Sequence, residues 1–531
     1  MPDNNKSLLE KWKNSVEAKQ IRKNFKLSQA GYLKELFRQS ADPGNLLEMV
    51  LDFCNENLRK DQGTFYTPPK TAYAMVKRAV DWFFKENSGD FSDRLKNIKI
   101  LDPACGCGEF LLAAIKVLLE KYRETDPDYQ HNVHKYIKWI IRNNLYGMDC
   151  NDNALELLLE RMQLLAGEMP DKTHIIQTDT LNYFYSGKCF KEVGKFDIVI
   201  GNPPYVSYGL RNVGKISRAR AEELKKRFVN SAEYKLNIYA LFMEFAINST
   251  RDNGIHSFIV PDSFLTGQYF TKLRNFMLQN CSFREFFFIR QKLFRAVPGS
   301  LVIYFAAGKK ADRKNTFSAA MAGDTADFTL PESGYKMLQS EFAGNHRQRF
   351  RLFFDEKTHR MVKNMEAESI CRLGDLLKLS SGIIGKNGKA SIISDKPVTS
   401  SFKPGVTSGK AIPGNGKVLW DGMYINSDKD AIKSGISNVD YNSAKIMIRQ
   451  TGDRIIAGVD YNNLLALNNI HIGNSQVPDL DLEELCSYLN SPEMVRYYQA
   501  ITLESGRAMA QIDLETLREL PVICKAIRKK S

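Results

Sequence analysis

A short apolar run passes directly into a glycine, an amide, two prolines and an aromatic ring in the stretch Ile198-Val199-Ile200-Gly201-Asn202-Pro203-Pro204-Tyr205. Residues 196–200 have the length and composition of a buried strand. The glycine and the two prolines end this strand, because proline fixes φ and lacks an N–H. The sequence therefore predicts a stiff loop at the carboxyl end of a strand, which is the edge of an open α/β sheet where ligands bind.

The chemistry of this loop suits an amino group on a planar ring. The side-chain oxygen of Asn202 and the carbonyl of Pro203 are both hydrogen-bond acceptors, and Tyr205 offers a flat face on which a base can stack. An exocyclic amino group is a poor nucleophile because its lone pair is delocalised into the ring. Two acceptors on its hydrogens favour a pyramidal nitrogen with a freer lone pair. The alternative is a proline-terminated strand followed by an exposed tyrosine.

Length and composition set outer bounds. A chain of 531 residues is too long for one core and predicts two or three domains. The net charge of +14 favours a polyanionic partner, although a solvated basic surface gives the same balance. Nine scattered cysteines, an odd number, indicate reduced thiols and a cytoplasmic protein. The absence of a long apolar run predicts no membrane span.

A second motif lies at residues 98–110, where an apolar strand enters a glycine-containing turn and then a helix. Gly106 and Gly108 allow the backbone to approach a ligand closely. The turn lacks the third glycine of dinucleotide-binding proteins and the Gly-Lys-Ser/Thr of a P-loop. The carboxylate of Asp102 would repel a pyrophosphate. The turn therefore suits a cofactor with an amino group and a sulfonium cation. Cys105 and Cys107 lack the two-residue gap of a zinc pair and are interpreted as small turn residues.

Two further strands are expected to end in acids. The strand 145–149 ends in Asp149, which can accept hydrogen bonds from ribose hydroxyls. The strand 174–176 leads to Asp179, which can accept from an adenine amino group. A lone aspartate at this place is usually a helix cap, but three acids that end three successive strands favour a ligand site.

A helix is predicted from Lys70 to Phe84, with Thr67 as its cap and Pro68 at its first position. In the functional interpretation, Phe65 and Thr67 face a small ligand at the start of this helix. The alternative is a well-capped helix with no ligand.

These motifs, in this order, resemble those of amino-methyltransferases that use S-adenosylmethionine. The cofactor motifs precede the catalytic loop, as in the gamma class of DNA adenine-N6 methyltransferases, the class of the TaqI DNA methyltransferase. The resemblance continues through residues 237–244, 254–261 and 293–305 and, more loosely, through residues 374–377, 488–494 and 520–522. It implies an α/β fold: a Rossmann-like methyltransferase domain with a mixed seven-stranded sheet, plus an α+β target-recognition domain.

The resemblance also implies roles for individual residues. Asn202, Pro203 and Tyr205 would hold an adenine that is flipped out of a short duplex site, and Phe294 would pack on the face of the base opposite Tyr205. Methyl transfer to N6 would need no metal. The residues that would bind S-adenosylmethionine are Phe65, Thr67, Asp102, Ala104, Gly106, Gly108, Asp149, Asp179, Pro204 and Phe242.

The expected domains are a helical extension at 1–60, the catalytic domain at 61–310, a linker at 311–370 and the target-recognition domain at 371–531. The expected partner is double-stranded DNA, bound by a monomer, with any cognate restriction endonuclease acting as a separate protein. About 60 residues before the cofactor motifs are too few for a fused nuclease domain.

Two stretches leave open questions. The basic run from Arg211 to Arg227 is either a solvated helix or a clamp for DNA phosphates. Residues 505–511 lack the proline that the TaqI-type enzyme places against the orphaned partner base, and Arg507 or Met509 is a candidate replacement. The rival functions are methylation of RNA adenine or protein glutamine, and a silent DNA-binding subunit that needs a partner for specificity.

Overall fold

The computed structural model describes residues 67–167, 173–185, 194–208, 216–234, 236–290, 299–323, 328–505 and 510–523. The predictions on residues 1–60, Phe65, Phe294, Arg507 and Met509 lie outside the described residues. The chain divides into two compact units, Met1–Phe350 and Arg351–Ser531, each of which is described by itself.

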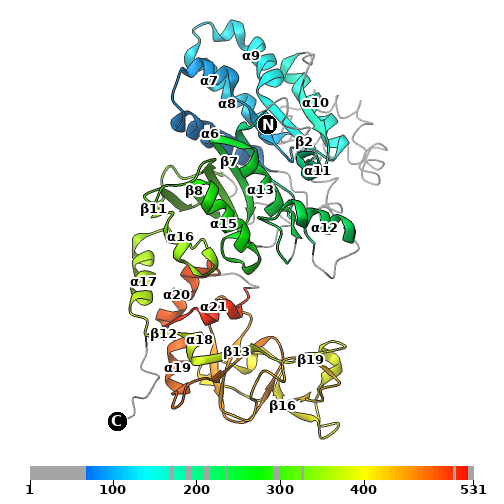
Figure 1. The fold of residues 1–531 in the computed structure, drawn as a ribbon, viewed down its shortest axis with the longest axis vertical. Coiled ribbons are helices and arrows are strands. Elements are labelled where there is room, and N and C mark those ends of the chain that lie inside the picture. The colour runs from blue at the N-terminus through cyan, green and yellow to red at the C-terminus, as the bar shows by residue number, and fades with distance from the viewer. Residues whose placement is uncertain are drawn as a thin grey trace, which may run out of the picture. The chain divides into compact units, whose positions relative to one another are not determined.

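Unit 1 is built on a nine-stranded sheet (Figure 1), whose strand order is β11-β10-β8-β9-β7-β4-β1-β2-β3. The strands are β1 (Ile100–Asp102), β2 (Leu145–Asp149), β3 (His174–Gln177), β4 (Phe196–Gly201), β7 (Thr250–Pro261), β8 (Ser282–Ile289), β9 (Leu301–Ala307), β10 (Thr316–Met321) and β11 (Tyr335–Leu338). The prediction of seven strands is therefore wrong, because β10 and β11 extend the sheet beyond β8.

The added strands also correct the predicted linker, since residues 316–338 were assigned to it. Small and polar residues suggested a connector, but Phe317 of β10 is buried against Phe283 and Phe286 of the sheet. Further along, residues 356–367 form the helix α17 (Glu356–Ala367). The boundary between the two units lies at residues 350–351, within the range 311–370 that was predicted to link them.

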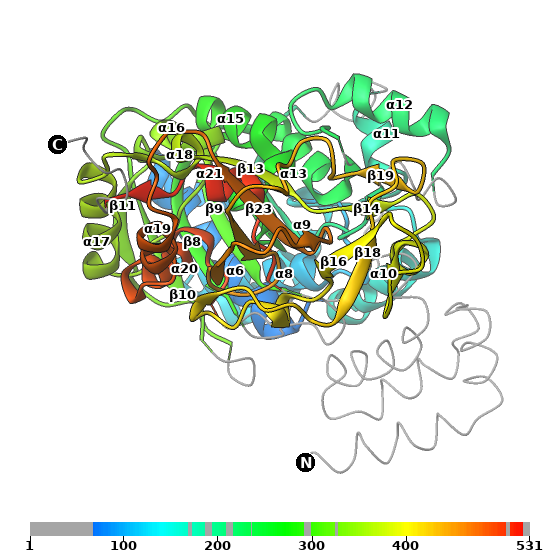
Figure 2. The ribbon, with the colours of Figure 1, turned by 90° about the horizontal axis from the view of Figure 1, so that it is seen from below.

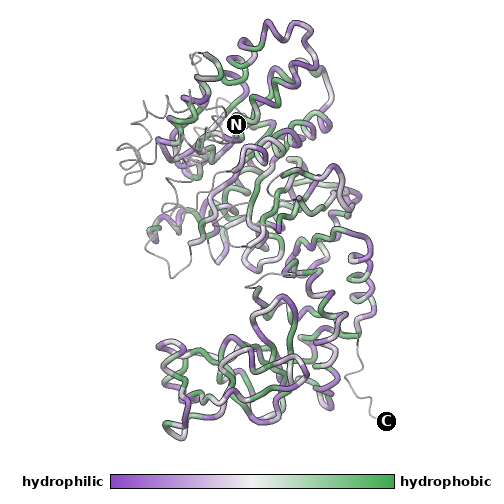
Figure 3. The backbone as a smooth tube through the Cα atoms, turned by 180° about the vertical axis from the view of Figure 1, so that it is seen from behind, coloured by the Kyte–Doolittle hydropathy of each residue, from purple (hydrophilic) through white to green (hydrophobic). Residues whose placement is uncertain are grey.

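Helices flank the strands of unit 1. Their bounds are α6 (Pro69–Glu86), α7 (Phe91–Asn97), α8 (Glu109–Thr125), α9 (Tyr129–Asn143), α10 (Asp152–Ala166), α11 (Thr180–Tyr185), α12 (Arg218–Arg227), α13 (Ile238–Ser249) and α15 (Thr271–Asn280). Hydrophobic and hydrophilic segments alternate along several of these helices (Figure 3). Ile198 and Ile200 of β4 share one hydrophobic cluster with residues of α6 and α8. Val199 points to the other face, because side chains alternate along a strand.

The start of α6 differs from the prediction by one residue. Pro68 occupies the cap position, its carbonyl accepts the N–H of Ala72 at 3.0 Å, and Pro69 is the first helical residue. No side chain caps the helix, so the prediction that Thr67 is the cap is wrong. Thr67 lies just before the helix and is buried.

Unit 2 contains two main sheets and several helices. One sheet has the order β13-β23-β20-β21-β17 and the other β15-β18-β16-β22, and Figure 2 shows β16 and β18 side by side. The strands are β13 (Leu377–Ser381), β15 (Ile393–Ser394), β16 (Phe402–Val406), β17 (Gly416–Lys417), β18 (Met423–Asn426), β20 (Lys445–Arg449), β21 (Ala457–Asp460), β22 (Leu465–Ala466) and β23 (Ile470–Ser475), and the later helices are α19 (Leu482–Leu489), α20 (Pro492–Thr502) and α21 (Leu514–Arg518).

The sequence of this half contains three short apolar runs that predict strands, at residues 418–420, 445–448 and 454–457. The run 445–448 is β20, whereas the run 454–457 reaches only the first residue of β21. Residues 418–420 are not a strand, and both Leu419 and Trp420 are exposed. The helices predicted at 482–498 and 514–520 are present as α19, α20 and α21.

Asn490 connects the end of helix α19 to the first residue of strand β21 in unit 2. It ends α19, and its side-chain amide accepts the N–H of Ala457 and donates to the carbonyl of Ala457, both at 2.9 Å. We expect Asn490→Ala to destabilise unit 2 by about 1–2 kcal/mol, because two hydrogen bonds to a buried backbone are lost. Hydrogen exchange at the Ala457 amide measures this effect. The exposed Asn438→Ala is the control, and unchanged exchange in Asn490→Ala would contradict the assignment.

None of the helices in the described part of the chain combines the length and apolar character that crossing a membrane requires.

Candidate active site at the carboxyl edge of the sheet

Four parallel strands bring three predicted site residues to one edge of the sheet of unit 1. Strand β1 pairs in parallel with β2 and with β4, and β2 pairs in parallel with β3. Asp102 ends β1, Asp149 ends β2, and Asn202 directly follows β4. The carboxyl ends of parallel strands meet at the same edge, so Asp102, Asp149 and Asn202 lie at one edge of the sheet, and their binding of a ligand there remains a prediction.

The turn after β1 contacts the end of β2 directly. The N–H of Gly106 donates to Asp149 at 2.9 Å, and the N–H of Cys105 donates to the Met148 carbonyl at 2.9 Å. Gly106 has a φ of 49° and Gly108 a φ of 88°, which is the left-handed region that glycine tolerates best. The cofactor turn and the second acid therefore form one hydrogen-bonded unit.

Gly108 has a packing role that sequence reasoning missed. A Cβ atom at this position would lie 2.1 Å from the Leu158 side chain of α10. The glycine therefore permits the close approach of two helices, in addition to the approach of a ligand. Only the fold reveals this contact, because the two residues are far apart in the sequence.

Asp102 is almost completely buried, with 1% of its surface exposed. Its Oδ1 atom accepts the N–H of Ala104 at 3.0 Å. Burial raises the pKa of Asp102 to about 8, and the neighbouring Asp149 carboxylate adds to this effect. Burial likewise raises the pKa of Asp149. A buried acid of this kind gains most from a cationic ligand, such as an ammonium group.

The catalytic loop begins against this acid. A Cβ atom at Gly201 would lie 2.6 Å from Oδ1 of Asp102, so only glycine fits where β4 ends. Asn202 follows, half-buried, with its Oδ1 atom buried, and Pro203 is buried beside it. The predicted acceptors for a target amino group thus lie next to the predicted cofactor acid.

The ring of Tyr205 is held from two sides. Its hydroxyl donates to the Ile259 carbonyl of β7 at 2.9 Å. The Tyr239 ring of α13 meets it edge-on, with ring centres 6.4 Å apart and an angle of 85°. Burial raises the pKa of Tyr205, so its hydroxyl remains a donor at physiological pH. Tyr239 in turn shares a 2.8 Å hydrogen bond with Ser263. The predicted stacking ring is therefore a fixed platform.

Replacing Tyr205 by phenylalanine tests this anchor. The stacking face remains but the bond to Ile259 is lost, which costs about 1 kcal/mol. For the methyl transfer that the sequence resemblance implies, we expect the rate under limiting substrate to fall by about 5-fold, since about 1.4 kcal/mol corresponds to a factor of ten. Steady-state kinetics measures the effect, with Tyr136→Phe of α9 as control, because it also loses a hydroxyl hydrogen bond, to Asp126 at 2.6 Å. A loss as large as that from Tyr205→Ala would show that the ring itself is not the platform.

The remaining predicted site residues in the described part of the chain are Phe242, Pro204 and Asp179. Phe242 is buried on α13, with its ring centre 6.5 Å from that of Phe245. Pro204 is half-buried within the loop. Asp179 accepts hydrogen bonds from the first turn of α11 and pairs with Arg220 at 2.8 Å. The helix-cap interpretation of Asp179 is thus confirmed, and its contact with a ligand remains a prediction.

Sequence reasoning missed Gly201, Tyr239 and Arg220. Tyr239 lies in a helix that was singled out for Phe242, and Arg220 lies in the basic run for which a solvated helix and a phosphate clamp were both left open. Their roles depend on contacts between distant segments, for which the sequence alone holds no signal.

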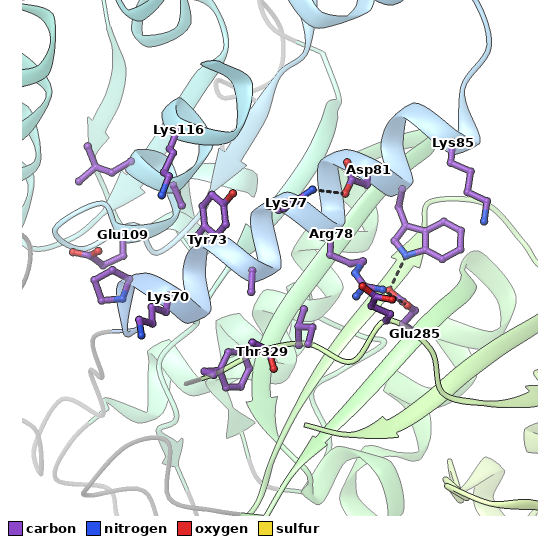
Figure 4. Close-up of a pocket in the computed structure, with 18 of the residues that line it drawn as sticks. Lys70, Tyr73, Lys77, Arg78, Asp81, Lys85, Glu109, Lys116, Glu285 and Thr329 are labelled. Atoms are coloured by element: carbon purple, nitrogen blue, oxygen red, sulfur yellow. Dashed lines mark hydrogen bonds and ion pairs between the residues drawn. The ribbon is translucent and has the colours of Figure 1, made fainter. Parts of the chain in front are cut away.

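A groove of about 950 Å³ runs along the outer face of α6 (Figure 4). Arg78 pairs with Glu285 at 2.8 Å, and Trp82 donates to the same carboxylate at 2.8 Å. None of the predicted site residues lines this groove. Within the described ranges, His, Cys, Asp and Glu side chains form no group of three or more that could hold a metal.

Two regions of the chain match known families. Residues 143–294 match the family described as Eco57I restriction-modification methylase, and this region contains Asp149, Asp179 and the catalytic loop. Residues 408–522 match the family described as TaqI-like C-terminal specificity domain, which lies within unit 2.

Individual relatives agree with these matches. The chain is 24% identical over 259 residues to the type II restriction enzyme and methyltransferase RM.Eco57I of Escherichia coli, covering 41% of this chain and 25% of that protein. It is 29% identical over 206 residues to the type II methyltransferase M.BstVI of Geobacillus stearothermophilus, covering 37% and 34%. The chain thus spans well under two thirds of the length of these relatives.

Solved structures show a similar fold. The cryoEM structure of the DrdV-DNA complex matches with a TM-score of 0.56 and 15% identity, over 87% of this chain and 54% of that one. The type IIL restriction-modification enzyme MmeI in complex with DNA matches with a TM-score of 0.52 and 13% identity, over 86% and 71%. One family match contains the loop after β4 and the other lies in unit 2, so over these two regions the chain is similar to Eco57I-type restriction-modification methylases and to TaqI-like C-terminal specificity domains.

Proposed function

We propose that this protein is a site-specific DNA methyltransferase that transfers a methyl group from S-adenosylmethionine to N6 of an adenine flipped out of a short duplex site. One observation carries the proposal. The loop that holds the amino-group acceptors begins at Gly201, which packs so closely on the buried Asp102 that an added Cβ atom would lie 2.6 Å from Oδ1 of this carboxyl. An acceptor set for a target amine and an acid for a cationic cofactor are therefore neighbours at one sheet edge. The family matches support the same function.

The residues at this edge fit S-adenosylmethionine. The buried carboxyl of Asp102 suits the ammonium group of the cofactor, because an ion pair offsets the cost of burying the charge. Asp149 suits the ribose hydroxyls, and the turn containing Ala104, Gly106 and Gly108 lies between these two acids. The proposed cofactor site is completed by Phe65, Thr67, Pro204 and Phe242. When bound, the cofactor supplies an electrophilic methyl group.

The chain's own residues then position the target base. Rotating an adenine out of the duplex costs a few kcal/mol, and stacking on Tyr205 returns about 1–3 kcal/mol. Asn202 and the Pro203 carbonyl accept the two hydrogens of N6 and aim its lone pair at the methyl group. Phe294 is proposed to cover the other face of the base. The fixed positions of these groups and their hydrogen bonds to N6 are proposed to accelerate the methyl transfer.

Unit 2 supplies the proposed reader of the DNA site. Its match to a specificity domain supports groove contacts from this unit, and the net charge of +14 supports binding to phosphates. We propose that the protein acts as a monomer on double-stranded DNA. A cognate endonuclease, where one exists, would act as a separate protein.

Mass spectrometry of nucleosides tests the proposal. Plasmid DNA incubated with the purified protein and S-adenosylmethionine should yield N6-methyladenine after digestion, and single-molecule sequencing should place it at one short motif. Parallel reactions contain RNA or a glutamine-bearing protein extract. Methylation of RNA or protein in place of DNA, or of cytosine in place of adenine, would refute the proposed function.

A further inference from the structure

The carboxylate of Asp179 lies between the end of β3 and the start of α11 and is surrounded by donors. Its Oδ1 atom accepts the N–H of Leu181 at 3.1 Å and the N–H of Asn182 at 3.3 Å. Its Oδ2 atom accepts the Asn182 side-chain amide at 3.0 Å and Nη2 of Arg220 at 2.8 Å. Four donors therefore converge on one carboxylate.

An ionised carboxylate offers about four lone-pair sites, so these four donors engage both oxygens of Asp179, although 48% of its side chain remains exposed. An adenine amino group that binds Asp179 must displace one of them. The two backbone donors belong to the first turn of α11 and cannot leave without unwinding the helix. The side chains on Oδ2 can rotate away, and the charged Arg220 contributes the stronger bond. The Asn182 side chain belongs to α11 itself, whereas Arg220 reaches Asp179 from the separate helix α12, where its Nη1 atom also pairs with Glu223 at 2.9 Å. Arg220 is therefore the donor that can leave Asp179 for another anion while α11 stays intact.

Arg220 also belongs to the basic helix α12. Ser217 caps this helix by accepting the N–H of Arg220 at 3.1 Å, and Leu224 buries its inner face. On the outer face, Arg218 and Lys226 are exposed. Arg220 itself has 21% of its side chain exposed, so it borders both the acid and the solvent. A phosphate beside α12 would find Arg220 within the same cationic surface.

We propose that Arg220 and the cofactor adenine compete for Asp179, and that a duplex phosphate relieves this competition by taking Arg220. This inference rests on the proposed function, because it assigns the adenine of S-adenosylmethionine to Asp179. Since each ligand removes a partner that opposes the other, DNA and cofactor bind with positive coupling, which is reciprocal by thermodynamic necessity.

The competition predicts that removing the contact between Arg220 and Asp179 raises the affinity for the cofactor. Calorimetry of S-adenosylhomocysteine binding, without DNA, should show that Arg220→Ala binds about 5-fold tighter or more than the wild type. S-adenosylhomocysteine lacks the sulfonium charge, so loss of a nearby cation has little direct effect on it. Arg218→Ala removes a cation from the same helix without touching Asp179 and should change the affinity less than about 2-fold.

A second variant shows that the gain runs through Asp179. Asp179→Asn keeps one oxygen for the helix cap and replaces Oδ2 by an amide nitrogen, which accepts from neither adenine nor arginine. In this background Arg220→Ala should leave S-adenosylhomocysteine affinity unchanged. Thermal melting confirms that the variants are folded.

Adding a short duplex that contains the methylated motif completes the test. The duplex should tighten S-adenosylhomocysteine binding to the wild type, and this gain should be lost in Arg220→Ala. Weaker or equal binding by Arg220→Ala without DNA, or an undiminished response to the duplex, would overturn the competition while DNA methylation by the wild type still stands. A wild type that binds no S-adenosylhomocysteine would overturn the proposed function and this inference together.

Discussion

Replacing Asn202 by alanine should reduce DNA methylation by at least about 100-fold, the cost of removing one precisely placed hydrogen-bonding group from a developing charge. The variant loses one of the two acceptors for the amino hydrogens of the target. The Pro203 carbonyl alone cannot hold the nitrogen in line with a methyl donor. Incorporation of labelled methyl groups into plasmid DNA measures the loss.

The same variant should bind S-adenosylhomocysteine as tightly as the wild type does. Asn202 lies on the loop after β4, whereas the proposed cofactor acids end β1 and β2. Exposed Asn97→Ala, at the end of α7 in unit 1, is the matched control and should keep full activity. Methylation near the wild-type rate in Asn202→Ala would refute the role of the loop. Parallel loss of cofactor binding would mean that the amide supports the cofactor instead.

Replacing Asp102 by asparagine should weaken S-adenosylhomocysteine binding by about 10-fold or more, because a buried charge partner of the ammonium group is lost. The wild-type affinity should also depend on pH. With its pKa raised to about 8 by burial, Asp102 holds a proton at lower pH and must release it to pair with an ammonium group. Affinity should therefore rise from pH 6 to pH 8 by up to about tenfold per pH unit.

Calorimetry at several pH values, in buffers of different ionisation enthalpy, measures both the affinity and the released proton. The asparagine variant should show a weak affinity without this pH dependence. A pH-independent affinity of the wild type over this range would contradict the assignment of Asp102 to the ammonium group.

The folding stability of the protein without cofactor should fall with rising pH, whereas the cofactor affinity rises. An aspartate with an unfolded pKa near 3.9 and a folded pKa of about 8 contributes stability below pH 4, and this contribution is lost as the pH rises towards 8. Each pH unit between the two values corresponds to about 1.4 kcal/mol. Asp102→Asn should therefore raise the melting temperature more at pH 8 than at pH 5. An equal change at both pH values would contradict the raised pKa.

Local patterns predicted the strands and the turn that carry the candidate site residues. The strands β1, β2, β3 and β4 and the glycine turn after β1 are short, apolar and sharply ended, so each could be predicted from its own residues. Parallel pairing then brought Asp102, Asp149 and Asn202 to one edge, as the fold class requires.

Contacts between distant segments could not be predicted. The fit of Gly201 against Asp102, of Gly108 against Leu158, and of Arg220 against Asp179 depends on how helices and strands pack in three dimensions. The prediction of the α6 cap was wrong for a local reason, because either of the two adjacent prolines, Pro68 and Pro69, fits the first turn of a helix. Strand β10 was missed because its small residues are typical of a connector, although Phe317 anchors it in the core.

The most direct measurement is a structure of the protein with a duplex containing its methylated motif and a non-reactive cofactor mimic. The account predicts an extruded adenine on the Tyr205 ring, with N6 within hydrogen-bonding distance of both the Asn202 side chain and the Pro203 carbonyl and facing the position of the methyl group. An adenine that remains stacked in the duplex, or an N6 atom beyond the reach of these two acceptors, would contradict it.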